Sequence, residues 1–335
     1  MQNIELFYPY LTNPQKVVIT MHQKPDGDAM GSSLGLYHFL KGLQHEVTVI
    51  SPTNWADFLD WMPGVENVIN FEKYTEKAVQ ILNEAQVIFC LDFNIFHRTK
   101  HLANHLAAAN AVKVLIDHHQ QPDAASFNFG KSDTQKSSTC EMIYDFIVES
   151  GYDSIINNEI AACLYTGVMT DTGSFRFPST TASVHRMIAR LKDAGLKHDQ
   201  IHHHIFDNFL ENRLRFIGFA LANRMEVLYE YNTALMYITK QDLQKFNIKT
   251  GDTEGLVNYL LTIQGMKLGA IVIDRDEERK WSFRSKGSFD VNQFARDHFE
   301  GGGHVNAAGG RSSLSIDQTL QQFKEVIKQY SNQLQ

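Results

Sequence analysis

Cysteine is scarce in this chain, with three among 335 residues. Cys90, Cys140 and Cys163 each lie inside an apolar stretch, and no two of them have the paired spacing of a metal or redox motif. This usage indicates reduced, buried thiols in a cytoplasmic protein. It implies no disulfide framework and argues against a thiolate-rich zinc site.

A membrane-spanning run and a signal peptide are also missing. No stretch approaches the roughly 18 consecutive apolar residues that a spanning helix needs. The first five residues, Met-Gln-Asn-Ile-Glu, lack the basic and apolar regions of a secretory signal. We therefore expect no membrane partner.

The chain has no excess of positive charge. It holds 31 Lys and Arg against 38 Asp and Glu, a formal net charge of −7. Proteins that coat long nucleic acids gain affinity by neutralising many phosphates with basic side chains, so this balance argues against such a partner. A short oligonucleotide or a mononucleotide needs only a few basic residues and remains compatible with the charge.

The chain is long enough for two hydrophobic cores, with 43% hydrophobic residues in its 335. The first half alternates short β-branched runs with helical periods, which is typical of an α/β domain with a parallel sheet and flanking helices. Strands are predicted near 16–21, 46–50, 87–91 and 112–116. A helix is predicted to begin at Ser32 or Ser33, where Gly31 and Ser32 would offer backbone N–H groups to a phosphate.

The second part of the chain predicts a smaller α+β domain. Strand-like runs lie at 235–238, 269–273 and 280–284, with helices near 291–298 and 315–330. We place the first domain at 1–206, a linker helix at 207–224 and the second domain at 225–335.

Four clusters of acids and histidines stand where strands or a helix should end. They are His22-Gln23-Lys24-Pro25-Asp26-Gly27-Asp28, then Asp92, then Asp117-His118-His119, and Asp171. Ligands bind where the carboxyl ends of parallel strands gather, so we expect the clusters to converge. Oxygen and nitrogen ligands without thiolate suit Mn²⁺ first, then Mg²⁺ or Co²⁺. Two such ions roughly 3.5–4 Å apart commonly stabilise both the attacking and the leaving oxygen when a phosphoester bond is broken. The pattern therefore predicts phosphoester hydrolysis.

These motifs, in this order, resemble the DHH phosphoesterase superfamily. The matching residues are His22-x-x-x-Asp26-x-Asp28 with Gly31-Ser32, then Asp92, Asp117-His118-His119, and Thr170-Asp171-Thr172-Gly173. Near the other end, the run Gly-Gly-Gly-His-Val-Asn-Ala-Ala-Gly at 301–309 is similar to the signature of the DHH-associated C-terminal domain. The resemblance implies an active site in the cleft between the two domains.

The resemblance also implies which residues bind two divalent cations. One ion would be held by His22, Asp26 and Asp92, and the other by Asp28, Asp92, His118 and Asp171. Asp92 would bridge the two ions and reduce the repulsion between them.

Catalytic roles are expected for Asp92, His118, His119 and Asp117. Asp117 would fix the tautomer of His118 by accepting its distal N–H. His119 would face the substrate phosphate, either as a donor to a non-bridging oxygen or as an acid toward the leaving group.

Substrate contacts are expected mainly in the second domain. The expected residues are Arg284 and Ser285 at the end of a strand, Gly302, Gly303 and His304 in a glycine loop, and Arg98 in the first domain. Arg98 and Arg176, each a few residues beyond a predicted ligand, have phosphate contact and surface pairing as open alternatives. The phenylalanines are expected in the core rather than as platforms for nucleobases.

The predicted function is degradation of very short RNA to nucleoside monophosphates, together with a phosphatase activity on 3'-phosphoadenosine 5'-phosphate (pAp). An alternative enzyme is a phosphodiesterase of cyclic or linear dinucleotides. An alternative of another class is a noncatalytic RNA-binding protein, although every expected ligand position holds a competent residue. The oligomeric state is open, with a homodimer as one alternative.

Overall fold

The structure is a computed structural model that describes residues 1–249, 251–275 and 278–335. The chain divides into two compact units, Met1–Asn208 and Phe209–Gln335. The segment expected as a linker helix contains α8 (Glu211–Asn223), and this helix belongs to the second unit. Phe216 and Ala220 of α8 are fully buried in the core of that unit, so hydrophobic packing rather than a linker role accounts for the helix.

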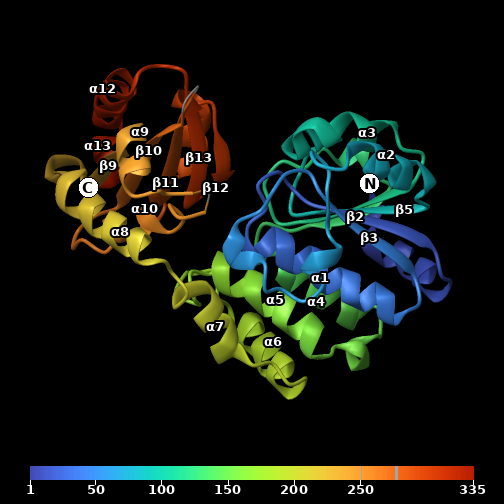
Figure 1. The fold of residues 1–335 in the computed structure, drawn as a ribbon. Coiled ribbons are helices and arrows are strands. Elements are labelled where there is room, and N and C mark those ends of the chain that lie inside the picture. The colour runs from blue at the N-terminus through green and yellow to red at the C-terminus, as the bar shows by residue number, and fades with distance from the viewer. Residues whose placement is uncertain (250, 276–277) are drawn as a thin grey trace. The chain divides into compact units, whose positions relative to one another are not determined.

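The first unit is built on a seven-stranded parallel sheet (Figure 1). In spatial order its strands are β1 (Gln2–Asn3), β7 (Phe129–Ser132), β6 (Val112–Asp117), β5 (Val87–Leu91), β2 (Lys16–Thr20), β3 (Glu46–Ser51) and β4 (Ile69–Asn70). The four strands predicted from β-branched runs are confirmed as β2, β3, β5 and β6.

Helices cover both faces of this sheet, as predicted for an α/β unit (Figure 1). The helices are α1 (Gly27–Gly42), α2 (Thr75–Glu84), α3 (Ala103–Ala108), α4 (Thr139–Glu149), α5 (Asn158–Asp171), α6 (Ala182–Asp193) and α7 (His198–Phe206). Side chains of a strand alternate between faces. Val17 and Ile19 of β2 therefore pack in the core with α1, α4 and α5, while Val18 packs with α2 and α3.

Among the described residues, none of the helices is both long enough and apolar enough to cross a membrane.

The helix α1 begins at Gly27, five or six residues before the predicted start. Asp26 is its N-cap, and Asp26 Oδ1 accepts hydrogen bonds from the backbone N–H groups of Asp28 and Ala29 at 3.1 Å each. A carboxylate that satisfies these otherwise unpaired N–H groups stabilises the helix start. The predicted start at Ser32 or Ser33 is therefore wrong, and the N–H groups of residues 31 and 32 lie inside the helix rather than facing a phosphate.

A stripe of three glycines lets α1 approach α5 closely. A β-carbon on Gly31 would lie 2.5 Å from the Cys163 carbonyl oxygen, and β-carbons on Gly27 and Gly35 would lie 2.5 and 2.7 Å from side chains of α5. Real β-carbons essentially never come this close to a neighbour, so a side chain at these positions would force the two helices or their side chains to shift. Because the helices run antiparallel, this contact brings the start of α1 against the end of α5, where two of the acid clusters lie.

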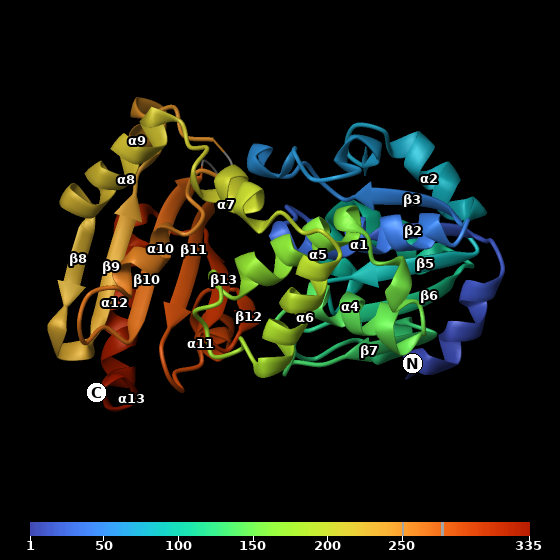
Figure 2. The ribbon, with the colours of Figure 1, turned by 90° about the horizontal axis from the view of Figure 1, so that it is seen from below.

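The second unit is a smaller α+β fold with a six-stranded mixed sheet (Figure 2). In spatial order its strands are β12 (Gly302–His304), β13 (Ala307–Ser312), β11 (Glu278–Ser285), β10 (Leu268–Arg275), β9 (Thr233–Ile238) and β8 (Met225–Leu228). Besides α8, its helices are α9 (Lys240–Lys245), α10 (Leu256–Leu260), α11 (Val291–His298), α12 (Ile316–Ile327) and α13 (Ser331–Leu334). Trp281 and Phe283 of β11 are fully buried and pack with α11 and α12, while α8 and α10 pack on the other face.

The glycine run expected as a loop forms the edge strand β12, which pairs antiparallel with β13. A β-carbon on Gly301 would lie 2.0 Å from the Gly309 carbonyl oxygen, and one on Gly303 would lie 2.4 Å from that of Ala307. At Gly302 the nearest atom would be 3.3 Å away. Two of the three glycines thus allow the close approach of the neighbouring strand, whereas Gly302 has more free space beside its α-carbon.

Candidate metal centre

The four acid and histidine clusters converge at the carboxyl edge of the parallel sheet. His118 Nε2 lies 3.6 Å from Asp28 Oδ2, 3.5 Å from Asp92 Oδ1 and 3.4 Å from Asp171 Oδ2. These four residues come from α1, from the loops after β5 and β6, and from the last residue of α5. Side chains up to 143 positions apart, the separation of Asp28 and Asp171, therefore share one site.

A second group adjoins the first through Asp92. His22 Nε2 lies 3.3 Å from Asp92 Oδ2 and 3.8 Å from Asp26 Oδ2. The two oxygens of Asp92 thus face different histidines, Oδ1 toward His118 and Oδ2 toward His22. The two oxygens of Asp26 also have different contacts, since Oδ1 caps α1 and Oδ2 faces His22.

The backbone at Asp92 has a left-handed conformation, with φ of +61°. Its N–H still donates to the Ile116 carbonyl oxygen at 3.1 Å, so the residue continues the pairing between β5 and β6. A non-glycine residue with positive φ costs free energy and persists where the surrounding structure demands it. Here it turns the chain sharply at the position where the shared carboxylate must lie.

Backbone carbonyls orient the imidazole rings. His22 Nδ1 contacts its neighbour's carbonyl oxygen, that of Gln23, at 2.8 Å, and His118 Nδ1 contacts that of Lys136 at 3.3 Å. A ring that donates its Nδ1–H in this way leaves Nε2 as an acceptor in the neutral form. Because both Nε2 atoms face carboxylate oxygens, a proton or a cation must lie between them.

The charges of the site favour a cation. Burial and the charge of Asp92 raise the pKa of Asp28 to about 7. Burial opposes ionisation of Asp92 as well, but a hydrogen bond with His22 and the nearby imidazoles hold its pKa well below the usual range. Although burial lowers the pKa of His118, the charges of Asp28 and Asp92 raise it overall. Divalent cations would replace the protons that this cluster otherwise draws in.

The donor set is suited to such ions. The described residues include one group formed by His22, Asp26 and Asp92, and another formed by Asp28, Asp92 and His118, each with ligand atoms within 4.8 Å of one another. Carboxylate oxygens and imidazole nitrogens without thiolate suit Mn²⁺, Mg²⁺ or Co²⁺.

One residue of the site was missed by sequence reasoning. The Thr139 hydroxyl donates to Asp92 Oδ1 at 3.0 Å, and the Thr139 backbone N–H donates to Asp28 Oδ2 at 2.6 Å. The Cys140 N–H donates to the other oxygen of Asp28 at 2.9 Å. The sequence signal was present, because Ser138 and Thr139 form a helix-start pattern, and Ser138 is the N-cap of α4. The carboxylate that this helix start would bind was not evident without the fold.

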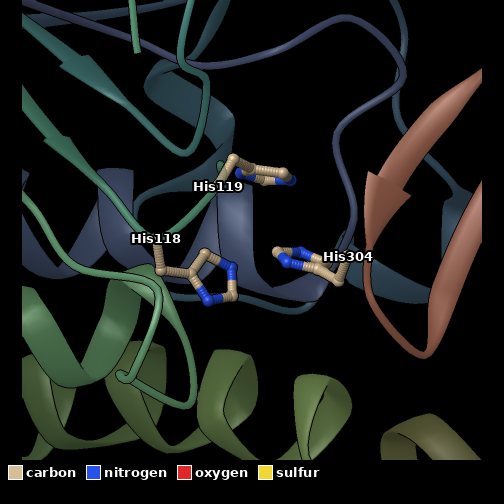
Figure 3. A group of neighbouring side chains, drawn as sticks. All are labelled: His118, His119 and His304. Carbon is tan, nitrogen blue, oxygen red and sulfur yellow. The ribbon is translucent and has the colours of Figure 1, made fainter. Parts of the chain in front are cut away.

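Asp117 pairs with His119 rather than with His118, which corrects the expected partner. His119 Nδ1 lies 2.7 Å from Asp117 Oδ1. Side chains two residues apart on an extended chain point to the same side, so Asp117 aligns with His119 while His118 projects elsewhere. The two imidazoles follow each other in the loop after β6 (Figure 3), with ring centroids 5.1 Å apart and ring planes at 75° to each other.

The proton between Asp117 and His119 can lie on either residue. Burial and the charge of Asp92 raise the pKa of Asp117 to about 6, while burial and the charge of Arg98 hold the pKa of His119 well below its ordinary value. With the proton on Nδ1, the neutral ring presents Nε2 as an acceptor. With the proton on Asp117, Nε2 carries the hydrogen and is a donor.

Arg98 lies beside this pair. Its charge influences the pKa values of His22, Asp117 and His119, and its backbone carbonyl accepts a hydrogen bond from the Gln23 N–H at 2.8 Å. Its side chain is only partly exposed and makes no hydrogen bond with the described part of the chain. A guanidinium in this position resembles a group placed for a ligand more than a surface ion pair.

The expected substrate residues of the second unit lie near one end of its sheet. Arg284 Nη1 donates to the Phe283 carbonyl oxygen at 3.0 Å. The buried hydroxyl of Ser285 donates to the Phe289 carbonyl oxygen at 2.7 Å and accepts from Asn306 Nδ2 at 2.9 Å, so it holds the turn after β11. Substrate contact by these residues, and by Gly302, Gly303 and His304, stays a prediction.

Each part of the chain matches a known protein family. The model of the DHH family, N-terminal domain, matches residues 16–168, and the DHHA1 domain model matches residues 229–333. The chain is 30% identical to the bifunctional oligoribonuclease and PAP phosphatase NrnA of Thermus thermophilus, over 93% of this chain and 89% of that protein. NrnA of Bacillus subtilis is 28% identical, over 94% and 95%.

Two further proteins are informative. The cyclic-di-AMP phosphodiesterase GdpP of Bacillus subtilis is 24% identical over 96% of this chain but only 48% of that protein. A crystal structure of an exopolyphosphatase-related protein from Bacteroides fragilis has a TM-score of 0.94 and 38% identity, and the match covers 99% of this chain and 97% of that one. The chain therefore belongs to the DHH family, with a DHHA1 domain in its second unit, and is a metal-dependent hydrolase of phosphoester bonds.

Proposed function

We propose that this chain uses two divalent cations, Mn²⁺ most favourably, to cleave very short oligoribonucleotides into nucleoside monophosphates. The same site would remove a phosphate from pAp, because both reactions deliver water to a phosphate beside a ribose. The observation that carries the proposal is the shared carboxylate of Asp92, whose two oxygens face two separate ligand groups. The similarity to the two NrnA proteins supports the choice of substrates.

The proposed ligand sets are those that the family resemblance implies, and the short distances between the side chains support them. His22, Asp26 and Asp92 would hold one ion, and Asp28, Asp92, His118 and Asp171 the other. The ions would lower the pKa of water toward neutrality and neutralise phosphoryl oxygens.

The chain's own residues would orient the substrate. Arg98 would bind a phosphate oxygen, since a guanidinium offers a planar pair of donors to phosphate. His119 would contact the reacting phosphate or the leaving group through Nε2, while Asp117 holds the ring by Nδ1. In the second unit, Arg284 would contact the far end of the oligonucleotide.

A substrate panel tests the proposal. Purified protein with Mn²⁺ is offered 5'-phosphorylated di- to pentanucleotides, pAp, cyclic dinucleotides, pyrophosphate and polyphosphate, and products are separated by chromatography. Nucleoside monophosphates from the shortest RNA and AMP from pAp are expected. Retention of RNA without product in the presence of two bound Mn²⁺ would favour a noncatalytic binding protein instead.

The similarity to GdpP favours a second candidate, a phosphodiesterase of cyclic or linear dinucleotides. Turnover of a cyclic dinucleotide at a rate above that of the linear RNA would favour this alternative. Turnover of polyphosphate alone would exclude both nucleotide functions.

The role of Arg284 has its own test. Arg284→Ala is expected to raise KM for oligonucleotides roughly 10- to 100-fold, the loss of a charged hydrogen bond, with Mn²⁺ binding unchanged. Arg311, an exposed arginine of the same sheet that pairs with Glu300, supplies the matched control Arg311→Ala. Equal KM values for the two variants would remove Arg284 from the site.

A further inference from the structure

The segment that follows the ligand Asp171 has an unusual backbone. Gly173, Ser174 and Phe175 have φ values of +58°, +59° and +63° in succession. Glycine adopts this left-handed conformation readily, but serine and phenylalanine do so at a cost. Such strain persists where surrounding contacts impose it, and it concentrates at functional sites.

A set of hydrogen bonds imposes the turn. The Ser174 N–H donates to the Met169 carbonyl oxygen at 2.8 Å, and the N–H groups of Arg176 and Phe177 both donate to that of Thr172 at 3.0 Å. The Phe175 ring packs against the ring of Tyr165, with centroids 5.5 Å apart. The turn is therefore a defined structure and reverses the chain directly after the metal-ligand position.

The turn leaves an aromatic ring and a guanidinium at the surface. Phe177 is 37% exposed, and its ring lies on the backbone of Gly173, where a β-carbon would be 2.6 Å from the ring. Arg176 is exposed, and its Nε donates to the Gly173 carbonyl oxygen at 2.7 Å. Within the described residues its two Nη groups have no partner. Both side chains are thus held close to Gly173, two residues from Asp171.

We propose that Phe177 and Arg176 form a nucleotide subsite beside the metal centre, with the base stacked on Phe177 and a phosphate bound by the Nη groups of Arg176. The inference rests on the proposed function and specifies how a nucleotide is held by the first unit. An exposed aromatic ring is a platform for any base, since every base has a π face. Arginine supplies the paired donors that phosphate accepts.

This subsite modifies the expectation that the phenylalanines are core residues. Most of them are buried, but Phe177 is held at the surface by a strained turn that a core residue would not need. A stacking subsite would favour nucleotides over simple phosphoesters without selecting one base, because stacking depends little on base identity.

The test uses 2-aminopurine riboside 5'-monophosphate, whose fluorescence is quenched when the base stacks. As a product-like monophosphate it reports binding without turnover, so the result does not depend on hydrolysis. The wild-type protein with Mn²⁺ is expected to quench the probe. Phe177→Ala should weaken binding about 5- to 100-fold, and Phe177→Trp should restore it.

Arg176 is tested with the matched nucleoside. Arg176→Ala should weaken binding of the monophosphate while leaving the weaker binding of 2-aminopurine riboside unchanged. Phe206→Ala and Arg186→Ala are the controls, since Phe206 is a similarly exposed phenylalanine at 43% and Arg186 is an exposed arginine of α6.

Each outcome decides between the two proposals. Absence of quenching by the wild-type protein, or equal binding by Phe177→Ala and Phe206→Ala, overturns the subsite even if RNA is hydrolysed. Quenching that is lost in Phe177→Ala supports the subsite even if the substrate panel shows no hydrolysis of RNA, in which case only the proposed reaction fails.

Discussion

Replacing Thr139 by valine isolates one hydrogen bond at the metal centre. Valine keeps the branched shape and the backbone N–H that binds Asp28, but it removes the hydroxyl that donates to Asp92 Oδ1 at 3.0 Å. A hydrogen bond to a charged group contributes about 1.5–3 kcal/mol. Since each 1.4 kcal/mol is about tenfold in affinity, Thr139→Val should weaken Mn²⁺ binding roughly 10- to 100-fold.

Isothermal titration calorimetry with Mn²⁺ measures this change. Thr139→Ser retains a hydroxyl and should bind Mn²⁺ nearly as tightly as the wild-type protein. Thr166→Val is the matched control, because Thr166 is equally buried and its hydroxyl donates to the Ala162 carbonyl oxygen at 2.8 Å instead of to a carboxylate. Its Mn²⁺ affinity should match that of the wild-type protein.

Two results would refute the reasoning. One is equal Mn²⁺ affinity in Thr139→Val and Thr166→Val, and the other is an affinity of Thr139→Ser as weak as that of Thr139→Val. Urea unfolding in the presence of EDTA separates a general loss of stability from a specific loss of metal binding, because only the former persists without metal.

Three other perturbations have defined outcomes. Asp92→Asn should reduce Mn²⁺ bound in equilibrium dialysis from two ions per chain to fewer than one and abolish hydrolysis; two retained ions would contradict the shared carboxylate. Gly31→Ala should lower the free energy of unfolding by about 1–3 kcal/mol, because its β-carbon would lie 2.5 Å from a carbonyl oxygen of α5. The control is Gly218→Ala in α8, where a β-carbon would meet nothing within 4 Å, and this variant should raise the free energy of unfolding by about 0.5–1 kcal/mol. Equal urea midpoints for Gly31→Ala and Gly218→Ala would disprove the close contact between α1 and α5. Burial opposes ionisation of Asp242, but two 2.9 Å hydrogen bonds from Arg224 lower the pKa of this carboxyl overall. The ion pair therefore stabilises the fold at a pH above the unfolded carboxyl pKa of about 4, and this stabilisation is lost as the pH falls below that value. Urea unfolding between pH 5 and pH 3 should show this loss in the wild-type protein and a flatter pH profile in Asp242→Asn. At pH 5 the free energy of unfolding of Asp242→Asn should be lower by about 2–4 kcal/mol, because Arg224 is left without its partner. Parallel pH profiles for the two proteins would contradict the role given to this ion pair.

Local signals in the sequence were sufficient for most secondary structure. Apolar runs predicted β2, β3, β5 and β6 to within a residue or so, and Ser138 and Asn157, residue types that favour helix starts, are the N-caps of α4 and α5. These features depend on neighbours along the chain, where hydrophobic period and capping chemistry are visible.

The errors occurred where one residue serves two purposes. Asp26 was interpreted only as a metal ligand, and its role as the cap of α1 was missed. The glycine run is expected as a substrate-binding loop, although Gly301 and Gly303 are needed for close pairing of β12 and β13. In both cases the second purpose involves a backbone contact that the residue type alone does not reveal.

The sequence by itself determined which chemical groups stand at the ends of strands and helices, and hence that oxygen and nitrogen ligands would gather at one edge of a sheet. Only the tertiary structure decided which distant groups touch, as Thr139 does with Asp28, a residue 111 positions away. The physical reason is that a hydrogen bond requires placement within a few tenths of an ångström. That placement is set by how α1, α4 and α5 pack on the sheet, and no single segment encodes it.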